Sequence, residues 1–204
     1  MRIGIDVGGT FTDLVVTRDE GGIAQFKTHS TPVDPSIGVF RGLAEISEAY
    51  GVSLDQLLHD VELIVHGTTV ATNTLVERKG ANLALITTSG FRDLLEMREG
   101  LKEDRYNLRM ASVEPLIPRY LRKGISERIK YDGSVHTPLD VESLRKTLLE
   151  LKGEGVDSIA VCFLFSFMNP DHELKAEAEI RKVFPDAFVS LSHEVLPQIK
   201  EFDR

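Results

Sequence analysis

The sequence predicts an α/β fold with a mixed sheet and a leading β-hairpin. Three short apolar segments with strand character open the chain, and helical and strand-like segments alternate after them. A glycine-rich turn joins the first two strands, and so short a connection pairs strands in antiparallel fashion. We therefore expect a mixed sheet and not the all-parallel sheet of dinucleotide-binding proteins.

The first half of the chain has clear turn signals between its predicted elements. Strands are predicted at residues 2–6, 13–17 and 23–29, and glycines at 21 and 22 supply the turn before the third. A helix is predicted over 35–50, because apolar residues recur at helical spacing and Pro35 suits a first turn. The elements expected next are a short helix at 54–59, a strand at 61–66, a helix at 69–79 and a strand at 82–87.

The second half contains one irregular segment. Residues 89–135 are rich in charges and include two prolines, so we expect short helices and an extended excursion, or a small subdomain. Regular periodicity returns with a helix at 140–152, a strand at 157–163, a helix at 171–183 and a strand at 187–191. The predicted layout is one lobe from residues 1–88 and 136–191, an insertion at 89–135, and the start of a linker at 192–204.

Composition argues against several classes of protein. The 204 residues carry 24 Lys and Arg against 32 Asp and Glu, a net charge of −8, which disfavours a general nucleic-acid binder. Cys162 is the single cysteine, so neither an internal disulfide nor a zinc site built from cysteines is expected. The longest apolar run, residues 159–168, is too short to span a bilayer, and no secretory signal opens the chain. We expect a cytoplasmic protein that binds neither nucleic acid nor membranes.

The most informative stretch is the turn between the first two strands, residues 6–13. Gly8 and Gly9 lack a Cβ atom, so the backbone can turn tightly there and approach a ligand closely. Consecutive backbone N–H groups in such a turn form a concavity that favours phosphate, and Thr10 and Thr12 add hydroxyl groups. The motif predicts a phosphate-binding hairpin; a plain hairpin turn with solvated side chains is the alternative.

Two carboxylates flank this turn. Asp6 ends the first strand and Asp13 begins the second. Oxygen ligands suit Mg²⁺, so both carboxylates could hold water on a magnesium ion. The motif is not a P-loop, because no lysine follows the glycines, and it is not a dinucleotide fingerprint, because the turn leads into a strand.

A second polar cluster lies between the predicted strand at 61–66 and the helix that follows it. His66 ends the strand, Thr68 and Thr69 can cap the helix, and Asn73 lies in its first turn. Because open α/β sheets bind ligands at the carboxyl ends of their strands, this cluster is a candidate second wall of the site. The alternative is a capped helix start beside an incidental histidine. The other histidines are expected on the surface: His29, His59, His136, His172 and His193.

Together the two motifs resemble the hydantoinase A/5-oxoprolinase family, which includes related subunits of acetone and acetophenone carboxylases. The hairpin itself resembles the first phosphate motif of the actin, sugar-kinase and Hsp70 superfamily, which implies a ribonuclease-H-like lobe. The resemblance extends over essentially the whole chain. The matching segments are Gly4–Asp13, His66–Thr69 with Ala71–Asn73, Gly90–Asp93, Pro115–Arg119, Asn169–Glu173 and Ser192–Pro197.

The resemblance implies an enzyme that uses ATP and Mg²⁺ to open a cyclic amide through a phosphorylated intermediate, as a hydantoinase, N-methylhydantoinase or 5-oxoprolinase. Such chemistry depends mainly on positioning and on stabilisation of charge. The resemblance implies roles for single residues. The phosphate contacts are Gly8, Gly9, Thr10 and Thr12, the metal residue is Asp6, the catalytic residues are Asp6, Asp13 and His66, and the substrate contacts are Thr68, Thr69, Asn73 and Arg92.

Members of that family are much longer than this chain. The resemblance therefore implies the N-terminal lobe of a larger enzyme, which alone turns over slowly or not at all and self-associates through exposed apolar surface. It also implies a homo-oligomer, a hydantoinase B-type partner subunit, or both. The alternatives are a subunit of an ATP-dependent ketone carboxylase, a non-catalytic nucleotide-binding or interaction module, and a sugar kinase. The residues after the glycines, Phe11-Thr12-Asp13, and the His66 motif argue against the kinase.

Overall fold

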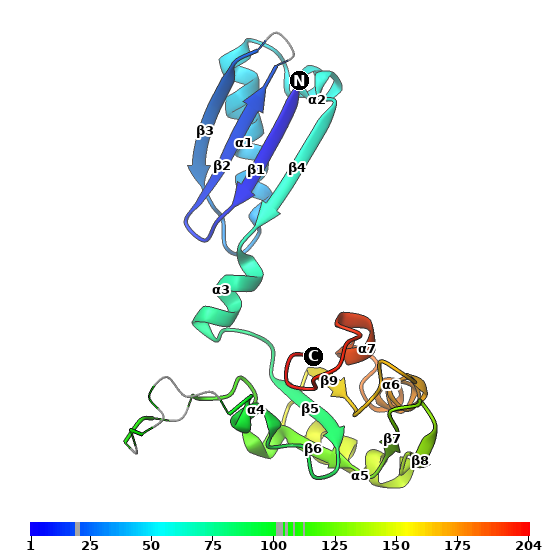
Figure 1. Ribbon diagram of the computed structural model, residues 1–204. Coiled ribbons are helices and arrows are strands. Elements are labelled where there is room, and N and C mark those ends of the chain that lie inside the picture. The colour runs from blue at the N-terminus through cyan, green and yellow to red at the C-terminus, as the bar shows by residue number, and fades with distance from the viewer. Residues whose placement is uncertain (19–20, 101–103, 105, 108, 112) are drawn as a thin grey trace. The chain divides into compact units, whose positions relative to one another are not determined.

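The structure is a computed structural model that describes residues 1–18, 21–100, 104, 106–107, 109–111 and 113–204. These residues form two compact units, Met1–Lys79 and Gly80–Arg204, and each unit has its own sheet (Figure 1). The leading hairpin and the mixed sheet are present, so the predicted α/β fold class is confirmed. The division into a lobe, an insertion and a linker stays a prediction.

Unit 1, residues 1–79, is built on a four-stranded mixed sheet in the order β3-β2-β1-β4. β2 pairs antiparallel with β1 and β3, and β4 pairs parallel with β1. The bounds differ from the predicted ranges by at most two residues at each end. The strands are β1 (Arg2–Val7), β2 (Phe11–Thr17), β3 (Ile23–His29) and β4 (Leu63–Thr68), and the helices are α1 (Pro35–Tyr50), α2 (Leu54–Asp60) and α3 (Val70–Glu77).

α1 covers one face of this sheet and forms the core of unit 1 with it (Figure 1). Asp34 caps the helix by accepting a hydrogen bond from the backbone N–H of Ser36, and Gly51 ends it in the left-handed conformation. Gly42 lies against Leu14 of β2, so a larger side chain there would push α1 off the sheet. The buried apolar residues are Ile3, Ile5, Val7, Leu14, Val16, Leu43, Ile46 and Leu57.

The opposite face of the sheet has no helix of unit 1 over it in the described part of the chain. β4 is exposed along its whole length, and its outer edge pairs with no other strand of the sheet. Leu63 and Val65 belong to this open face, because they pair with Arg2 and Gly4 and successive residues alternate between faces. Unit 1 therefore has an apolar edge strand with both faces accessible.

Unit 2, residues 80–204, contains a parallel sheet of four strands in the order β10-β9-β5-β6. The sequence did not indicate that the two halves of the chain form separate sheets. The strands of this sheet are β5 (Leu83–Thr88), β6 (Arg122–Ile125), β9 (Ser158–Cys162) and β10 (Phe188–Leu191), and β7 (Arg128–Ile129) pairs with β8 (Val135–Thr137). The helices are α4 (Leu94–Met97), the 3₁₀ turn η1 (Arg119–Leu121), α5 (Val141–Gly153), α6 (Asp171–Val183) and α7 (Ser192–Val195).

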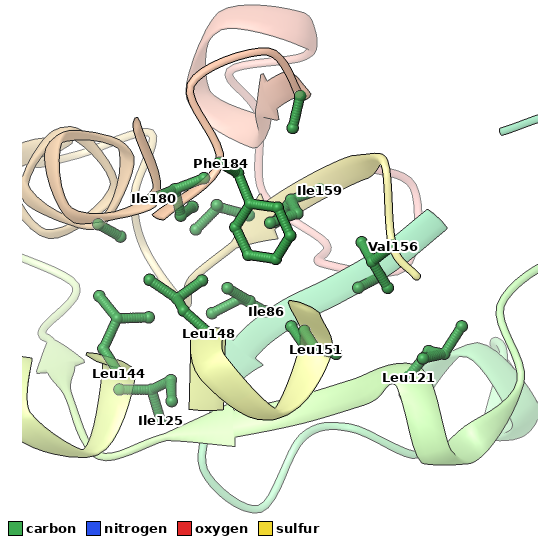
Figure 2. Close-up of a cluster of buried hydrophobic side chains, with 14 of the residues drawn as sticks. Ile86, Leu121, Ile125, Leu144, Leu148, Leu151, Val156, Ile159, Ile180 and Phe184 are labelled. Carbon is green, nitrogen blue, oxygen red and sulfur yellow. The ribbon is translucent and has the colours of Figure 1, made fainter. Parts of the chain in front are cut away.

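α5 and α6 supply the apolar side chains that cover one face of the parallel sheet. Figure 2 shows Leu148 and Leu151 of α5 beside Ile86 of β5, with Phe184 next to Ile159. Complete burial of such a side chain contributes about 1.5–3 kcal/mol to stability, so this cluster accounts for a folded unit without any disulfide.

The described part of residues 89–135 includes the strands β6 and β7, where the sequence predicted short helices and an extended excursion, or a small subdomain. The sequence pattern does not indicate β6, because the strand begins with two charged residues, Arg122 and Lys123, and lacks an apolar run. Arg122 is nevertheless buried: its Nη1 donates to the backbone oxygen of Arg92 at 3.1 Å, and its Nη2 donates to the carboxylate of Glu96 at 2.5 Å. A charged side chain is buried at low cost only when it is paired in this way.

The carboxylate of Glu173, in the first turn of α6, joins three segments of unit 2. It is fully buried and accepts hydrogen bonds from the backbone N–H of Phe163 at 2.9 Å and the hydroxyl of Ser192 at 2.7 Å. The backbone N–H of His193 donates to it at 3.1 Å, and the ring Nδ1 of His193 lies 2.7 Å away. Glu173 thus fixes the end of β9 and the start of α7 to the start of α6.

A second buried carboxylate explains why the expectation of a surface His172 is wrong. His172 precedes Glu173, and its Nδ1 lies 2.7 Å from the carboxylate of Glu127, which is also buried. Thr88, at the end of β5, donates to the other oxygen of Glu127 and accepts from the backbone N–H of Leu164 at 3.0 Å. Two neighbouring residues of α6 are therefore linked to the ends of two strands: His172 through Glu127 to the end of β5, and Glu173 directly to the residue after β9. No local sequence pattern predicts these long-range contacts.

No helix in the described ranges combines the length and the apolar character needed to cross a membrane.

Replacement of Glu173 by Ala is expected to destabilise unit 2 by about 3 kcal/mol or more, because several buried donors lose their acceptor. Glu177→Ala is the matched control on the same helix, since Glu177 makes a surface pair with Arg181 that is worth about 0.5 kcal/mol. Urea unfolding followed by circular dichroism measures both. Equal losses in the two variants would contradict the role given to Glu173.

Glu179 is expected to make the stability of unit 2 depend on pH in the acid range. Arg145 of α5 donates two hydrogen bonds to it, at 2.7 and 3.1 Å, and these, with a bond from Lys182, lower the pKa of Glu179 from 4.5 to about 2. A lowered pKa stabilises the folded state above pH 4.5, and this stabilisation is lost as the pH falls from 4.5 to about 2. The stability difference between the protein and Glu179→Gln should shrink over that interval; a constant difference would refute the assignment.

Candidate functional site

The candidate site of unit 1 is the tip of the hairpin between β1 and β2. The backbone N–H of Gly8 donates to the oxygen of Phe11 at 3.0 Å and closes the turn. Within the described residues, the N–H groups of Gly9 and Thr10 have no hydrogen-bond acceptor. The turn therefore offers two adjacent backbone donors to an anion, as the sequence predicted.

Close approaches explain why glycines occupy two positions of this turn. A Cβ atom on Gly8 would lie 3.0 Å from the backbone oxygen of Phe11, which cannot move without opening the turn. A Cβ atom on Gly9 would lie 3.1 Å from Nδ2 of Asn73, in α3. The predicted phosphate hairpin and the predicted helix start thus lie in contact within unit 1.

Asp6 and Asp13 face each other across the hairpin. They are direct cross-strand partners, so both side chains lie on the open face of the sheet, opposite α1. Asp13 accepts a hydrogen bond from Lys27 of β3 at 2.8 Å. Asp6 is exposed, and its carboxylate has no hydrogen bond or ion pair among the described residues. Of the two, Asp6 is the carboxylate still available to a cation.

β4 and α3 form the second side of the site. Asp6 pairs with Gly67 in the parallel register, and a Cβ atom on Gly67 would lie 4.0 Å from the carboxylate of Asp6. The hydroxyl of Thr68 donates to the backbone oxygen of Val7 at 3.2 Å and accepts from the N–H of Val70, the first residue of α3. Thr69 occupies the N-cap position, but its side chain makes no cap bond. The amide of Asn73 donates to the hydroxyl of Thr69 at 3.3 Å, which holds both side chains beside the turn.

Two of the predicted site residues of unit 1 do not face the two aspartates. His66 pairs with Ile5, so alternation places its side chain on the α1 face. The side chain of Thr12 is fully buried, and its hydroxyl lies 2.9 Å from that of Ser30. The side-chain positions therefore do not support the roles predicted for these two residues. Arg92 belongs to unit 2, and its role stays a prediction.

Sequence reasoning missed two residues that shape the turn. Lys27 neutralises Asp13, and Ser30 holds the tip through its N–H, which donates to the backbone oxygen of Thr10 at 3.0 Å. The strand register could have predicted the contact of Lys27. Counting back along both strands from the turn between β2 and β3 places Asp13 opposite Lys27.

The arrangement fits Mg²⁺ bound with a phosphate better than a metal held by the protein alone. No group of three or more His, Cys, Asp and Glu side chains within the described ranges could hold a metal ion. Mg²⁺ commonly takes only one or two carboxylates, together with water and substrate phosphates. The unpaired carboxylate of Asp6 beside the free N–H groups of the turn meets that requirement.

Comparison with known proteins matches nearly the whole chain. Residues 2–184 match the family described as "Hydantoinase/oxoprolinase N-terminal region". The chain is 41% identical over 205 residues to the caprolactamase subunit alpha of Pseudomonas jessenii. This alignment covers 100% of the chain and 30% of the caprolactamase subunit. It is 38% identical over 216 residues to the acetophenone carboxylase gamma subunit of Aromatoleum aromaticum, covering 99% of the chain and 29% of that protein.

Solved structures show the same similarity. The crystal structure of ATP-dependent caprolactamase from Pseudomonas jessenii matches with a TM-score of 0.86 over 99% of the chain and 30% of that protein's chain. The nucleotide-free structure of acetone carboxylase matches with a TM-score of 0.90 and 27% identity, over 98% of the chain and 30% of the other. The chain thus spans less than a third of the length of these relatives.

Replacement of Gly8 by Ala is expected to destabilise unit 1 by about 1–3 kcal/mol, because the new methyl group meets the backbone oxygen of Phe11. Gly4→Ala is the control in the preceding strand, β1, since a Cβ atom there would lie 4.0 Å from its nearest neighbour, the backbone oxygen of Val15. Urea unfolding measures the difference, and amide chemical shifts of residues 8–11 report the turn. If Gly8→Ala changed neither the stability nor the amide shifts of the turn, the close approach to the oxygen of Phe11 would not be the reason for a glycine at position 8.

Proposed function

The chain belongs to the hydantoinase/oxoprolinase family, and from this premise we propose that it forms the N-terminal lobe of an ATP-dependent enzyme that opens cyclic amides. The observation that carries the proposal is the exposed, unpaired carboxylate of Asp6 beside the two unbonded N–H groups of the hairpin tip. A carboxylate can bind Mg²⁺, and backbone N–H groups next to it can bind the phosphate oxygens that the metal also contacts.

Each residue near the tip has a role in the proposed site. The N–H groups of Gly9 and Thr10 bind phosphate oxygens, and Gly8 gives the turn its shape. Asp6 holds Mg²⁺, directly or through water, and Asp13 orients water or metal while Lys27 balances its charge. Bound Mg²⁺ supplies positive charge that stabilises the transferring phosphoryl group.

Asn73 and Thr69 line the side of the proposed site next to the turn, where they are placed to contact the substrate or a phosphate oxygen. Thr68 contributes through its cap on α3, and Thr12 through its bond to Ser30, which fixes the strand under the turn. Catalysis by His66 and substrate binding by Arg92 remain part of the proposal and rest on the motif alone.

The proposed reaction activates a poor electrophile. The amide oxygen of the ring takes the terminal phosphoryl group of ATP, and ADP leaves. Water then adds to the activated carbon, and the ring C–N bond breaks as the nitrogen takes a proton, which leaves an acyl phosphate. A second water hydrolyses the acyl phosphate to a carboxylate and inorganic phosphate. The protein contributes position and charge stabilisation, which is the main requirement of phosphoryl transfer.

The relatives support this class of reaction and one alternative. The caprolactamase relative is named as ATP-dependent, and a lactam is a cyclic amide. Two other relatives are subunits of acetophenone carboxylase and acetone carboxylase, so a subunit of an ATP-dependent ketone carboxylase is the second candidate function. A non-catalytic nucleotide-binding module is the third, and binding of ATP without hydrolysis by the complete gene product would favour it.

Partner subunits and compartment are also part of the proposal. Several relatives are named as single subunits of larger enzymes, which supports assembly with a hydantoinase B-type partner, a second copy of the chain, or both. We place the enzyme in the cytoplasm, where ATP is available, and expect residues 1–204 alone to be inactive or slow.

Replacement of Asp6 by Ala in the complete gene product is expected to lower ATP turnover about 10²–10³-fold, because the transferring phosphate loses its charge stabilisation. Asp55→Ala is the matched control, since Asp55 is an exposed carboxylate of the same unit in α2. ADP release is measured with Mg-ATP and, in turn, hydantoin, N-methylhydantoin, 5-oxoproline, caprolactam, and acetone or acetophenone with bicarbonate.

Stimulation by one cyclic amide would support the proposed hydrolase and identify its substrate. Stimulation only by a ketone with bicarbonate would transfer the assignment to the carboxylases. Equal turnover in the protein, Asp6→Ala and Asp55→Ala would refute the phosphate site at the hairpin.

A further inference from the structure

Unit 2 has a basic pocket at the carboxyl end of β5, independent of the hairpin of unit 1. Ser89, Gly90, Arg92, Asp93, Arg119 and Gly124 line a cavity of about 330 Å³. A second cavity of about 440 Å³ shares Arg92 and Arg119 with it and adds Tyr120, Arg122 and Lys123. Carboxyl ends of parallel strands are where open α/β sheets bind ligands.

The charges around the two cavities leave one cation in excess. Arg119 donates to both oxygens of Asp93, at 2.8 and 2.9 Å, and this pairing lowers the pKa of Asp93. The other acidic partners are Glu96, which pairs with Arg122, and Glu150, which lies 3.4 Å from Lys123.

Arg92 shares the carboxylate of Asp93 with Arg119 and is the more distant of the two cations. Its Nε lies 4.0 Å from Asp93, beyond hydrogen-bond distance, and that carboxylate already pairs with Arg119. Within the described residues, the guanidinium of Arg92 makes no hydrogen bond. A guanidinium with free donors in a pocket is suited to a planar anion with two oxygens.

The loop after β5 adds unbonded backbone donors. Ser89 donates its N–H to Ile125 at 2.8 Å and Phe91 donates to Thr88 at 3.0 Å, but the N–H groups of Gly90 and Arg92 have no acceptor in the part of the chain that is described. Gly90 has a φ of +90°, and its conformation turns the loop around the first cavity.

A buried donor in the wall of the pocket is also unsatisfied. The Nε of Arg122 is buried and has no partner in the described structure, although its two other nitrogens are bonded. Orphaned donors of this kind are rare in protein interiors. Glu96 balances the charge of Arg122, which holds the loop through its bond to the backbone oxygen of Arg92.

We propose that this pocket binds a carboxylate-type monoanion, held by the guanidinium of Arg92 and the backbone N–H of Gly90. The single excess positive charge favours a monoanion over a phosphate dianion, since three of the four cations are already paired with carboxylates. Organic carboxylates and bicarbonate share this chemistry. The site rests on unit 2 alone and stands whether or not the hairpin binds ATP.

The test is an NMR titration of residues 1–204 with acetate, bicarbonate, inorganic phosphate and neutral acetamide at constant ionic strength. Acetate or bicarbonate is expected to shift the amide signals of Gly90 and Arg92 in a saturable way, and acetamide is not. Arg92→Ala should weaken binding about tenfold or more, because a hydrogen-bonded charge is lost. Arg92→Lys should also weaken it, because a lysine cannot present two parallel donors.

Lys146→Ala is the matched control, since it removes an exposed positive charge on α5 outside the pocket. Unchanged binding in this variant supports the site, and preference between acetate and bicarbonate then identifies the organic or inorganic source. Equal weakening in Arg92→Ala and Lys146→Ala would reduce the effect to general attraction by charge and overturn the proposal. Tighter binding of phosphate than of both monoanions would overturn it as well, as would the absence of any saturable shift.

Discussion

The pairing of β1 with strands on both sides is the constraint on which unit 1 depends. β2 returns antiparallel from the hairpin, and β4 arrives parallel after α1 and α2. Asp6 lies opposite Asp13 of β2 on one side and opposite Gly67 of β4 on the other. The registers of these two pairings with β1 therefore fix the positions of all three residues. A shift of one residue would turn Asp6 toward α1 and the apolar residues toward the open face. The geometry of the candidate site therefore follows from the pairing of the strands, and the loop residues need only complete it.

Unit 2 uses buried carboxylates for a comparable purpose. Glu127 and Glu173 each accept hydrogen bonds from groups at the ends of strands, and each lies next to a histidine. A parallel sheet leaves backbone groups unpaired where its strands end, and burial makes such groups costly unless an acceptor is present. Glu173 satisfies that requirement by accepting from the N–H of Phe163. Glu127 acts indirectly, through the hydroxyl of Thr88, which accepts from the N–H of Leu164.

Local patterns predicted most of this fold, and long-range contacts account for the rest. Helix α1 follows from the spacing of its apolar residues, its Asp cap and Gly51, and the hairpin follows from its glycines. β6 was not predictable, because the burial of Arg122 depends on Glu96 and on the backbone of Arg92. The motifs predicted that Gly9 and Asn73 belong to one site, and the structure places them in contact. The motifs did not predict the face of the sheet on which His66 lies, because that depends on the pairing of β4 with β1.

The exposed edge of β4 has a consequence for how the protein is handled and redesigned. A strand with a free edge and apolar residues on its surface is a template to which another extended segment can add by backbone hydrogen bonds. Natural sheets block such edges with lysine or proline, and β4 contains neither. A lysine in place of Val65 would put a charge on the open face while leaving the hairpin tip intact. Such a gatekeeper residue would make unit 1 easier to study at the concentrations that spectroscopy requires.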